Sequence, residues 1–549
     1  MSYRDGFGYH TDPGAPTGNS SPATNAPARP RATALPPRRQ RGYGGGVRTD
    51  TGVLALLALA CFAILLAAGQ QSGIFRDELY YIACANRPAW GYVDHPPLSI
   101  AVLAAVRAAL GESLLALRLP AALAGALTVF LTGLIARAMG GGRGAQLVAA
   151  LAVAITPQLM AISSFYSMNA IEMVVFALLE LLAVHLLTGG APRWWLAFGL
   201  VAGLGLLNKY SVALLAAGLV AGLLVSPQRR QLATPWPWLG GALALLLFAP
   251  HLWWEHVNGW PTREFMANAT ARKNVHLGAL EFLAGQLTLA NPLAAPLWIA
   301  GLVGLLAASR LRALRPLGIA YVLAFVVLVA QGGKAYYLSP IYPMLFAAGA
   351  TLLEGAARRR AWRWPVPAAA AVLLAGGVAM GPLAVPVLPP AVHVRYAAAI
   401  GIGAPPMERN TVGALPQHIA DRYGWEELVA AVRRAADRLS PVDRARAVVF
   451  AGNYGEAGAV EVLGRGLPPV ISGHNSYWLW GPGALRPDDP ILIVGGRAAD
   501  LQAYFDTFEL VETSRCQWCM PYENDVPIYL ARGLRQPIDE LWAKVKRFI

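Results

Sequence analysis

The sequence predicts a mainly α-helical protein that crosses a membrane many times and carries a C-terminal extracytoplasmic α/β domain. The chain has 549 residues, of which 56% are hydrophobic and only 14% charged, and its mean hydropathy is +0.44. Soluble globular chains are typically about 25% charged. Long apolar runs with short loops between them fill most of the region between residues 50 and 385. Most of the chain is therefore expected to lie in lipid.

Residues 1–49 are rich in Pro, Gly, Ser and Arg and offer little that a core could bury. A segment of this composition cannot offset the entropy cost of ordering, so we predict a disordered tail. Its arginines from Arg29 to Arg48 lie just before the first apolar run. This placement favours a cytoplasmic tail over a cleaved signal peptide.

Eleven transmembrane helices are predicted between residues 50 and 385. The first apolar run, residues 52–69, is long enough to cross a hydrocarbon core of about 30 Å at about 1.5 Å per residue. The further spans are expected at residues 115–138, 144–162, 170–189, 194–207, 211–226, 237–254, 285–308, 316–331, 338–356 and 364–385.

The arginines between the spans support this count. Short cytoplasmic loops collect Lys and Arg, and the loops after even-numbered spans are cytoplasmic if the tail is. All of these loops are basic, through Arg137 and Arg143, Arg193, Arg229 and Arg230, Arg310, Arg312 and Arg315, and Arg358 to Arg363. The net charge of +14 therefore reports membrane orientation, and no nucleic-acid partner is expected. An odd number of spans places residues 386–549 outside the cytoplasm.

The extracytoplasmic region has the pattern of an α/β domain. Residues 421–439 repeat apolar side chains at helical spacing, and residues 447–451, 491–494 and 526–530 form short apolar runs typical of buried strands. Cys516 and Cys519 form a C-x-x-C pair without a thioredoxin-like context, and a local disulfide is allowed outside the cytoplasm.

The polar stretch from Phe75 to Leu98 directly follows the first span and contains the adjacent acids Asp77 and Glu78. Ionisable groups at span ends cost on the order of 2.5–3.5 kcal/mol each on insertion scales, so their concentration on the outer side predicts an outward polar cavity. Carboxylates alternate there with cations. Such a mixture suits a substrate with a nucleophilic hydroxyl and a phosphate, because a carboxylate can take a proton and Lys or Arg can hold phosphate.

The chain resembles glycosyltransferase family 39, which includes the protein O-mannosyltransferases and the lipid A aminoarabinose transferase and has the GT-C fold. The resemblance starts with the outer acidic pair and the His-Pro-Pro-Leu step at residues 95–98. It continues, in order along the chain, at residues 165–170, 203–210, 258–262, 333–338, 415–417, 453–457, 472–477 and 519–523.

The resemblance implies inverting sugar transfer from a polyprenyl-phosphate-linked donor to a lipid, polysaccharide or protein acceptor at the outer membrane face. It places the acceptor-side carboxylate at Asp77, with Glu78 as the alternative. His95 is a predicted substrate-binding residue, but the aminoarabinose transferase has Lys at this place before the Pro-Pro step. Lys209 and Arg263 are therefore the better phosphate ligands. The remaining predicted substrate-binding residues are Asn169, Glu172, Tyr81, Tyr336 and Tyr337.

Several alternatives stay open at this point. A divalent metal is possible at Asp94 with His251 or His256, although the spacing matches no strong zinc motif. Lys209 could snorkel to the interface, and the tyrosine pairs could be interfacial belt residues. For the whole chain, the rival functions are a multi-span transporter or lipid flippase of envelope biogenesis and a non-catalytic membrane scaffold. A transporter is disfavoured because no inverted repeat is visible.

Overall fold

The computed structural model describes residues 51–403 and 408–549, and the predicted tail at residues 1–49 lies outside them. All described residues belong to one compact unit. Its first part is helical. The helices are α1 (Thr51–Gly69), α2 (Arg76–Ala85), α3 (Leu98–Leu110), α4 (Leu114–Ala138), α5 (Arg143–Ala154), α6 (Pro157–Ile162), α7 (Met168–Leu187), α8 (Trp194–Leu206), α9 (Val212–Leu224), α10 (Pro235–Val257), α11 (Pro261–Asn268), α12 (Ala279–Leu289), α13 (Ala295–Ala307), α14 (Arg315–Ala330), α15 (Tyr342–Arg359), α16 (Pro365–Ala384) and α17 (Pro390–Ala399).

Each of the predicted apolar segments coincides with helix in the structure. In the described part of the chain, five helices are long and apolar enough to cross a membrane alone, or seven spans result if each sharply bent pair counts as one. The two bent pairs are Val212–Leu224 with Pro227–Ala233, at 111°, and Ala279–Leu289 with Pro292–Ala307, at 97°. The predicted segment 144–162 is divided into α5 and α6, and Pro157 opens the second of these helices. Eleven spans therefore remains a prediction.

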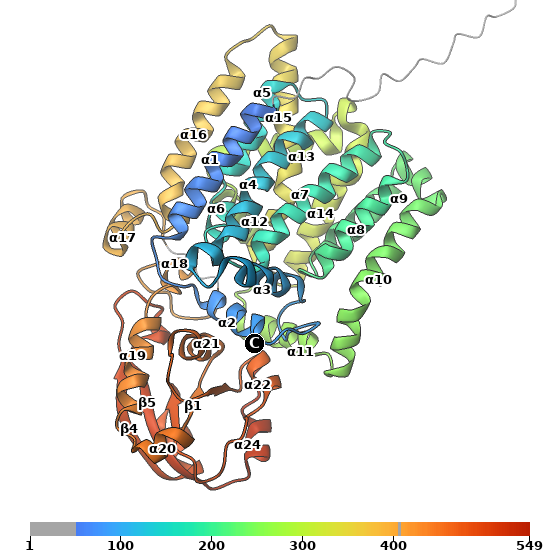
Figure 1. Ribbon diagram of the computed structural model, residues 1–549. Coiled ribbons are helices and arrows are strands. Elements are labelled where there is room, and N and C mark those ends of the chain that lie inside the picture. The colour runs from blue at the N-terminus through green and yellow to red at the C-terminus, as the bar shows by residue number, and fades with distance from the viewer. Residues whose placement is uncertain (1–50, 404–407) are drawn as a thin grey trace, which may run out of the picture. The chain divides into compact units, whose positions relative to one another are not determined.

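The apolar surface of the helices fits a lipid environment. Leu56 on α1, Leu246 on α10 and Val378 on α16 are 67%, 70% and 76% exposed. Exposed leucines and valines along whole helices would be costly in water but are well solvated by the hydrocarbon core of a membrane. Within the helical part, α4 packs against α1, α5, α7 and α15, and α13 packs against α15 (Figure 1). Gly301 and Gly349 allow the α13–α15 approach, because a Cβ at either would collide with a backbone carbonyl of the other helix.

The C-terminal part contains a five-stranded mixed sheet in the order β2-β1-β3-β5-β4. Strand β1 pairs in parallel with β2 and β3, and β5 pairs antiparallel with β3 and β4; Val449 lies opposite both Val470 and Leu492. The strands are β1 (Val448–Ala451), β2 (Val470–Ser472), β3 (Ile491–Val494), β4 (Phe505–Ser514) and β5 (Val526–Leu534). The helices are α18 (Gln417–Ala420), α19 (Trp425–Ala436), α20 (Pro441–Arg446), α21 (Tyr454–Leu463), α22 (Ser476–Trp480), α23 (Ala498–Leu501) and α24 (Ile538–Lys544).

The three predicted strands and the predicted helix at 421–439 are present, as β1, β3, β5 and α19. The sequence did not reveal β2, which has only three residues, or β4. As an edge strand β4 exposes several polar side chains, so it lacks the continuous apolar run of a central strand. Cys516 and Cys519 form the local disulfide that the sequence allowed.

Helix α21 lies directly against α2, and this contact joins the sheet part to the first polar stretch of the chain (Figure 1). The approach depends on two glycines of α21. A Cβ at Gly455 would lie 2.6 Å from Arg76 Cγ, and one at Gly458 would lie 2.9 Å from Leu79 Cβ and 3.0 Å from the Leu79 carbonyl carbon. Any side chain at these two positions would collide with α2. The sequence Gly-x-x-Gly therefore allows α21 to pack closely against α2.

Candidate active site

Helix α2 holds the acidic pair and separates its two carboxylates. The Glu78 carboxylate accepts a hydrogen bond of 2.8 Å from the Phe75 backbone N–H, which satisfies a free donor at the start of the helix. Consecutive residues of an α-helix point about 100° apart, so the two acids face different surroundings. The Asp77 side chain is 35% exposed, whereas Glu78 is completely buried.

Glu78 is fully engaged inside the protein. Its Oε1 accepts hydrogen bonds from Arg118 Nε at 2.9 Å and from the Tyr166 backbone N–H at 2.7 Å. Its Oε2 accepts from Arg118 Nη2 at 2.7 Å, in addition to the Phe75 N–H. Four donors thus occupy the four lone-pair directions of the carboxylate. The geometry is that of a buried ion pair linking α2 to α4, and it favours Asp77 as the acid with room for a substrate hydroxyl.

Asp77 is held by the C-terminal part of the chain. Its Oδ1 accepts a hydrogen bond of 2.8 Å from the Tyr454 hydroxyl, and it lies 3.8 Å from Arg76 Nε. Arg76 in turn lies 3.7 Å from Asp421 and donates to the Tyr522 hydroxyl at 2.6 Å. Burial raises the pKa of the Asp421 carboxyl to about 6, although Arg76 acts in the opposite direction. The first polar loop and the C-terminal part therefore share one network of charges.

His95 lies in an aromatic enclosure and not on an open surface. It is fully buried, and the rings of Tyr80, Tyr81 and Tyr92 lie 6.1, 4.7 and 5.0 Å from its own ring. Its Nδ1 lies 3.0 Å from the Pro96 carbonyl oxygen, and its Nε2 lies 4.0 Å from Asp94 Oδ1. Tyr81 is one helical turn after Asp77 on α2, so it links the acidic pair to His95.

Four of the other predicted substrate-binding residues surround Lys209, which follows α8. The Lys209 ammonium donates to Asn169 Oδ1 at 2.8 Å and to Glu172 Oε2 at 2.7 Å, both on α7. It also lies over the rings of Tyr337 and Tyr336, at 4.9 and 5.8 Å from their centroids. Ser211 donates a further hydrogen bond to Glu172. The cation is thus fixed by a carboxylate, an amide and two aromatic faces.

Two further lysines converge on a carboxylate that the sequence did not single out. Lys334 and Lys273 lie 2.8 and 3.7 Å from Glu408 Oε1, and all three side chains are largely buried. Burial alone would raise the pKa of Glu408, but the two lysines lower it to about 2. Burial also lowers the pKa of Lys273, where the charges of Arg76 and Asp77 are felt as well. This lysine pair is therefore a fixed cationic group that shares one buried carboxylate.

Arg263, on α11, is the predicted residue that the structure leaves apart. It is exposed, and no hydrogen bond or ion pair of its side chain is found among residues 51–403 and 408–549. The neighbouring Glu264 instead pairs with Lys546 at 2.6 Å. A contact between Arg263 and a phosphate therefore remains a prediction.

Four residues of this region were not predicted as site residues, and the sequence pattern around them differs in how much it indicates. Lys273 and Lys334 stand in predicted outer loops, and that position alone marked them as members of a polar cavity. Tyr454 lies in residues 453–457, which carry part of the family resemblance without a role for any single residue. Glu408 follows no recognisable pattern, because its position beside two lysines arises only from the backbone bridge between Asn274 and Glu408.

The described residues contain no group of three or more His, Cys, Asp or Glu side chains placed to hold a metal ion. His251, one of the histidines considered for a metal, already uses both ring nitrogens. Its Nδ1 lies 2.8 Å from the Trp90 carbonyl oxygen, and its Nε2 lies 2.5 Å from the Tyr210 hydroxyl.

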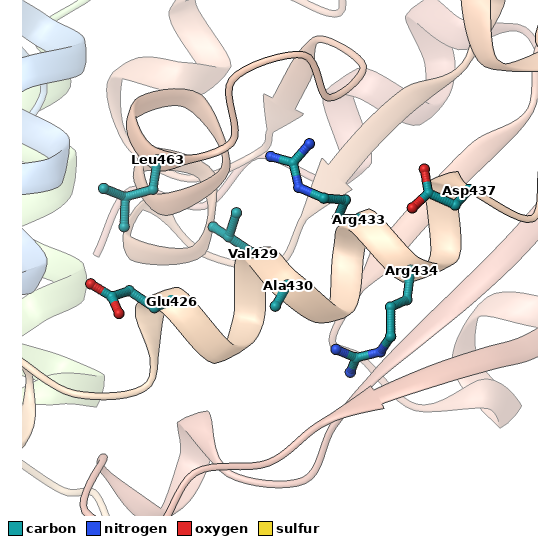
Figure 2. Close-up of a pocket in the computed structure, with 7 residues that line it drawn as sticks. All are labelled: Glu426, Val429, Ala430, Arg433, Arg434, Asp437 and Leu463. Atoms are coloured by element: carbon teal, nitrogen blue, oxygen red, sulfur yellow. The ribbon is translucent and has the colours of Figure 1, made fainter.

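A hollow of about 410 Å³ lies elsewhere, on the sheet part (Figure 2). Figure 2 shows α19 running along it with Leu463, at the end of α21, opposite Val429. Its charged lining consists of Glu426, Arg433, Arg434 and Asp437. None of the predicted site residues lines this hollow, so it does not belong to the candidate active site.

Comparisons with known proteins agree with the motif resemblance. The family model of the dolichyl-phosphate-mannose-protein mannosyltransferases matches residues 94–254. The solved structure of ArnT from Cupriavidus metallidurans bound to undecaprenyl phosphate is similar with a TM-score of 0.59 at 15% identity, over 88% of this chain and 98% of that one. The same protein in its apo state gives 0.57 at 14% identity, over 87% and 98%. No curated protein sequence matches. The chain therefore has the GT-C fold and is similar to the membrane glycosyltransferases that share it.

Proposed function

We propose that this chain is an inverting glycosyltransferase that moves a sugar from a polyprenyl-phosphate-linked donor to a lipid, polysaccharide or protein acceptor. The observation that carries the proposal is the partly exposed Asp77 carboxylate on α2, together with the buried ammonium groups of Lys209, Lys273 and Lys334, each held by a carboxylate. The fold shared with an undecaprenyl-phosphate-bound ArnT supports a lipid phosphate as the leaving group.

The reaction can be written from these groups. The acceptor hydroxyl attacks the anomeric carbon, a new carbon–oxygen bond forms, and the bond from that carbon to the phosphate oxygen breaks. The hydroxyl proton passes to Asp77, which orients the attacking oxygen as a general base. The electron pair leaves with the lipid phosphate, and fixed cations stabilise that charge. Attack opposite the leaving group inverts the anomeric configuration.

Lys209, Lys273 and Lys334 are the cations that we assign to the donor phosphate. All three are paired with carboxylates, which holds the ammonium groups in place without a substrate. A phosphate that enters this region would exchange one anionic partner for another, so the cations need not be desolvated again on binding. Tyr336 and Tyr337 would then form an aromatic wall beside Lys209.

The same proposal assigns membrane position and domains. We infer a multi-pass protein of the cytoplasmic membrane with residues 1–49 as a cytoplasmic tail. Residues 50–385 are the transmembrane transferase module, and residues 386–549 are the extracytoplasmic domain. The arginines of the predicted inner loops support this orientation. The Cys516–Cys519 disulfide supports it as well, because disulfides persist mainly outside the cytoplasm.

Substitution of Asp77 tests the transferase. Asp77→Asn keeps the size of the side chain and its contact with Tyr454, but it removes the proton acceptor. Transfer of radiolabelled sugar from polyprenyl phosphate should fall by about 10²–10⁴-fold, the usual contribution of a general base, with an unchanged melting temperature. Glu112→Gln, at a 64% exposed acid between α3 and α4, is the matched control and should retain activity.

Two outcomes would contradict this assignment. Full transfer by the Asp77→Asn protein would exclude Asp77 as the base. Lipid translocation by the unmodified protein in liposomes, without transfer from any of several sugar donors, would instead favour the transporter or flippase alternative.

A further inference from the structure

The C-terminal part of the chain contacts the polar stretch of residues 75–98 at two places, at Asp77 and next to Asp94. At the first, Tyr454 donates to Asp77. At the second, the Tyr80 hydroxyl lies 2.7 Å from Ser476 Oγ and donates a hydrogen bond of 3.0 Å to Asp94. Residues 453–457 and 472–477 of the C-terminal part therefore contact this stretch, the first at Asp77 directly and the second through Tyr80, which bonds Asp94.

The contact at Asp77 is rigid on both sides. Tyr454 is 7% exposed, its backbone N–H donates to His474 Nδ1 at 3.3 Å, and its ring lies beneath the Arg76 guanidinium at 5.1 Å. It is the first residue of α21, whose glycines permit the close approach to α2. The phenol thus reaches Asp77 from a backbone that cannot easily move away.

The hydrogen bond leaves part of the carboxylate available. Tyr454 occupies Oδ1, and no hydrogen bond to Asp77 Oδ2 is found within the described part of the chain. Burial raises the pKa of the Tyr454 phenol well above its usual value, and the Asp77 charge acts in the same direction. The phenol therefore stays protonated and remains a donor throughout the working pH range.

We propose that Tyr454 is a positioning residue of the transferase, which fixes the Asp77 carboxylate so that its second oxygen faces the acceptor hydroxyl. This inference rests on the proposed function. It makes the C-terminal domain part of the catalytic machinery, because without the domain the base has no fixed rotamer. Groups that orient a catalytic side chain typically contribute about 10–100-fold to activity.

The test is Tyr454→Phe in the full-length protein, with the pH profile of sugar transfer as the main measurement. A hydrogen bond donated to a carboxylate favours its ionised form. Loss of the bond should therefore move the acid limb of kcat/KM to higher pH by roughly 0.5–1 unit. The value of kcat should fall about 10-fold, with little change in donor KM.

Tyr477→Phe is the matched control. Its hydroxyl, also buried and also in the C-terminal part, donates to Glu461 at 2.9 Å and touches neither acid of the loop. It should leave the acid limb in place. In an Asp77→Asn background, Tyr454→Phe should cause no further loss of transfer, because the phenol acts through the Asp77 carboxylate.

The outcomes separate this inference from the proposed function. The positioning role alone would be overturned if the unmodified protein transfers sugar and Tyr454→Phe has the same activity and the same acid limb of its pH profile. Absence of transfer by the unmodified protein would overturn the function first. If Tyr454→Phe does not fold, 3-fluorotyrosine at position 454 keeps the shape of the ring and strengthens the donor. The acid limb should then move to lower pH, and an unmoved limb would contradict the proposal.

Discussion

Two adjacent carboxylates on α2 have opposite environments, and this difference decides their chemistry. Glu78 pairs with the buried Arg118, and removing one partner of such a pair typically costs about 3–5 kcal/mol because the other charge is left buried. Asp77 meets one phenol and remains partly open. A fully engaged acid and a partly open acid therefore stand one residue apart, and their order in the chain does not distinguish them.

Glu408 is a second residue whose contribution can be measured through pH. Its pKa is about 2 in the folded protein against an ordinary value of 4.5. Between these values the unfolded chain binds more protons than the native one, so stability rises with pH across the window and is complete above it. The shift corresponds to roughly 3 kcal/mol.

Glu408→Gln should therefore lower the melting temperature at pH 7 and leave Lys273 and Lys334 without their anionic partner. In the unmodified protein, the stability that Glu408 contributes is lost as the pH falls from 4.5 to 2. The stability of the variant should therefore fall less over this range. Thermal unfolding in detergent across pH measures both effects. Glu509→Gln, at an exposed position of β4, is the control. Coincident melting curves for Glu408→Gln and the unmodified protein would show that the lysine pair needs no counter-charge.

At the scale of elements, the contact between α2 and α21 depends on small residues. Gly458 faces Leu79 at a distance that admits no methyl group without movement, since its Cβ would lie 3.0 Å from a backbone carbon. Backbone atoms cannot give way as a flexible side chain can. The glycine is therefore a requirement of helix packing and not of local conformation.

Gly458→Ala should destabilise the protein by about 1–3 kcal/mol, the usual cost of overpacking, and should reduce transfer by moving Tyr454 away from Asp77. Gly241→Ala on α10 is the matched control, because a Cβ there meets nothing within 4 Å. It should be neutral, or stabilising by up to about 1 kcal/mol through helix propensity. Melting temperatures of the two variants measure the difference. Equal values would exclude a tight contact between α2 and α21.

At the scale of the whole molecule, the proposed orientation makes a separate prediction. A single cysteine at Arg497, whose side chain is 85% exposed in the C-terminal part, should react with a membrane-impermeant maleimide on intact cells. A cysteine at the exposed Arg229 should react only after permeabilisation, because its loop is assigned to the cytoplasm. The native Cys61 and Cys84 are buried, and Cys516 and Cys519 are paired, so they add little background. Labelling of Arg497→Cys from the cytoplasmic side alone would refute the extracytoplasmic domain.

Much of the architecture was predictable because its physical cause is local. Apolar length defines the helices, and short apolar runs define β1, β3 and β5. The strand β4 and the division between α5 and α6 were not predictable in this way. An edge strand takes its stability from a partner distant in sequence, and a Pro at the first turn of a helix is compatible with continuous apolar composition.

The sequence by itself determined a mainly helical membrane protein with an α/β domain, a GT-C resemblance and a polar stretch that contains Asp77 and Glu78. It also grouped Asn169, Glu172, Lys209, Tyr336 and Tyr337 as substrate-binding residues, and the structure brings these together. Only the tertiary structure decided which acid is enclosed, that Glu408 neutralises two lysines, and that Tyr454 reaches Asp77. These pairings join residues up to 377 positions apart. Hydrogen bonds and ion pairs act over a few ångströms, so no local pattern in the sequence encodes them.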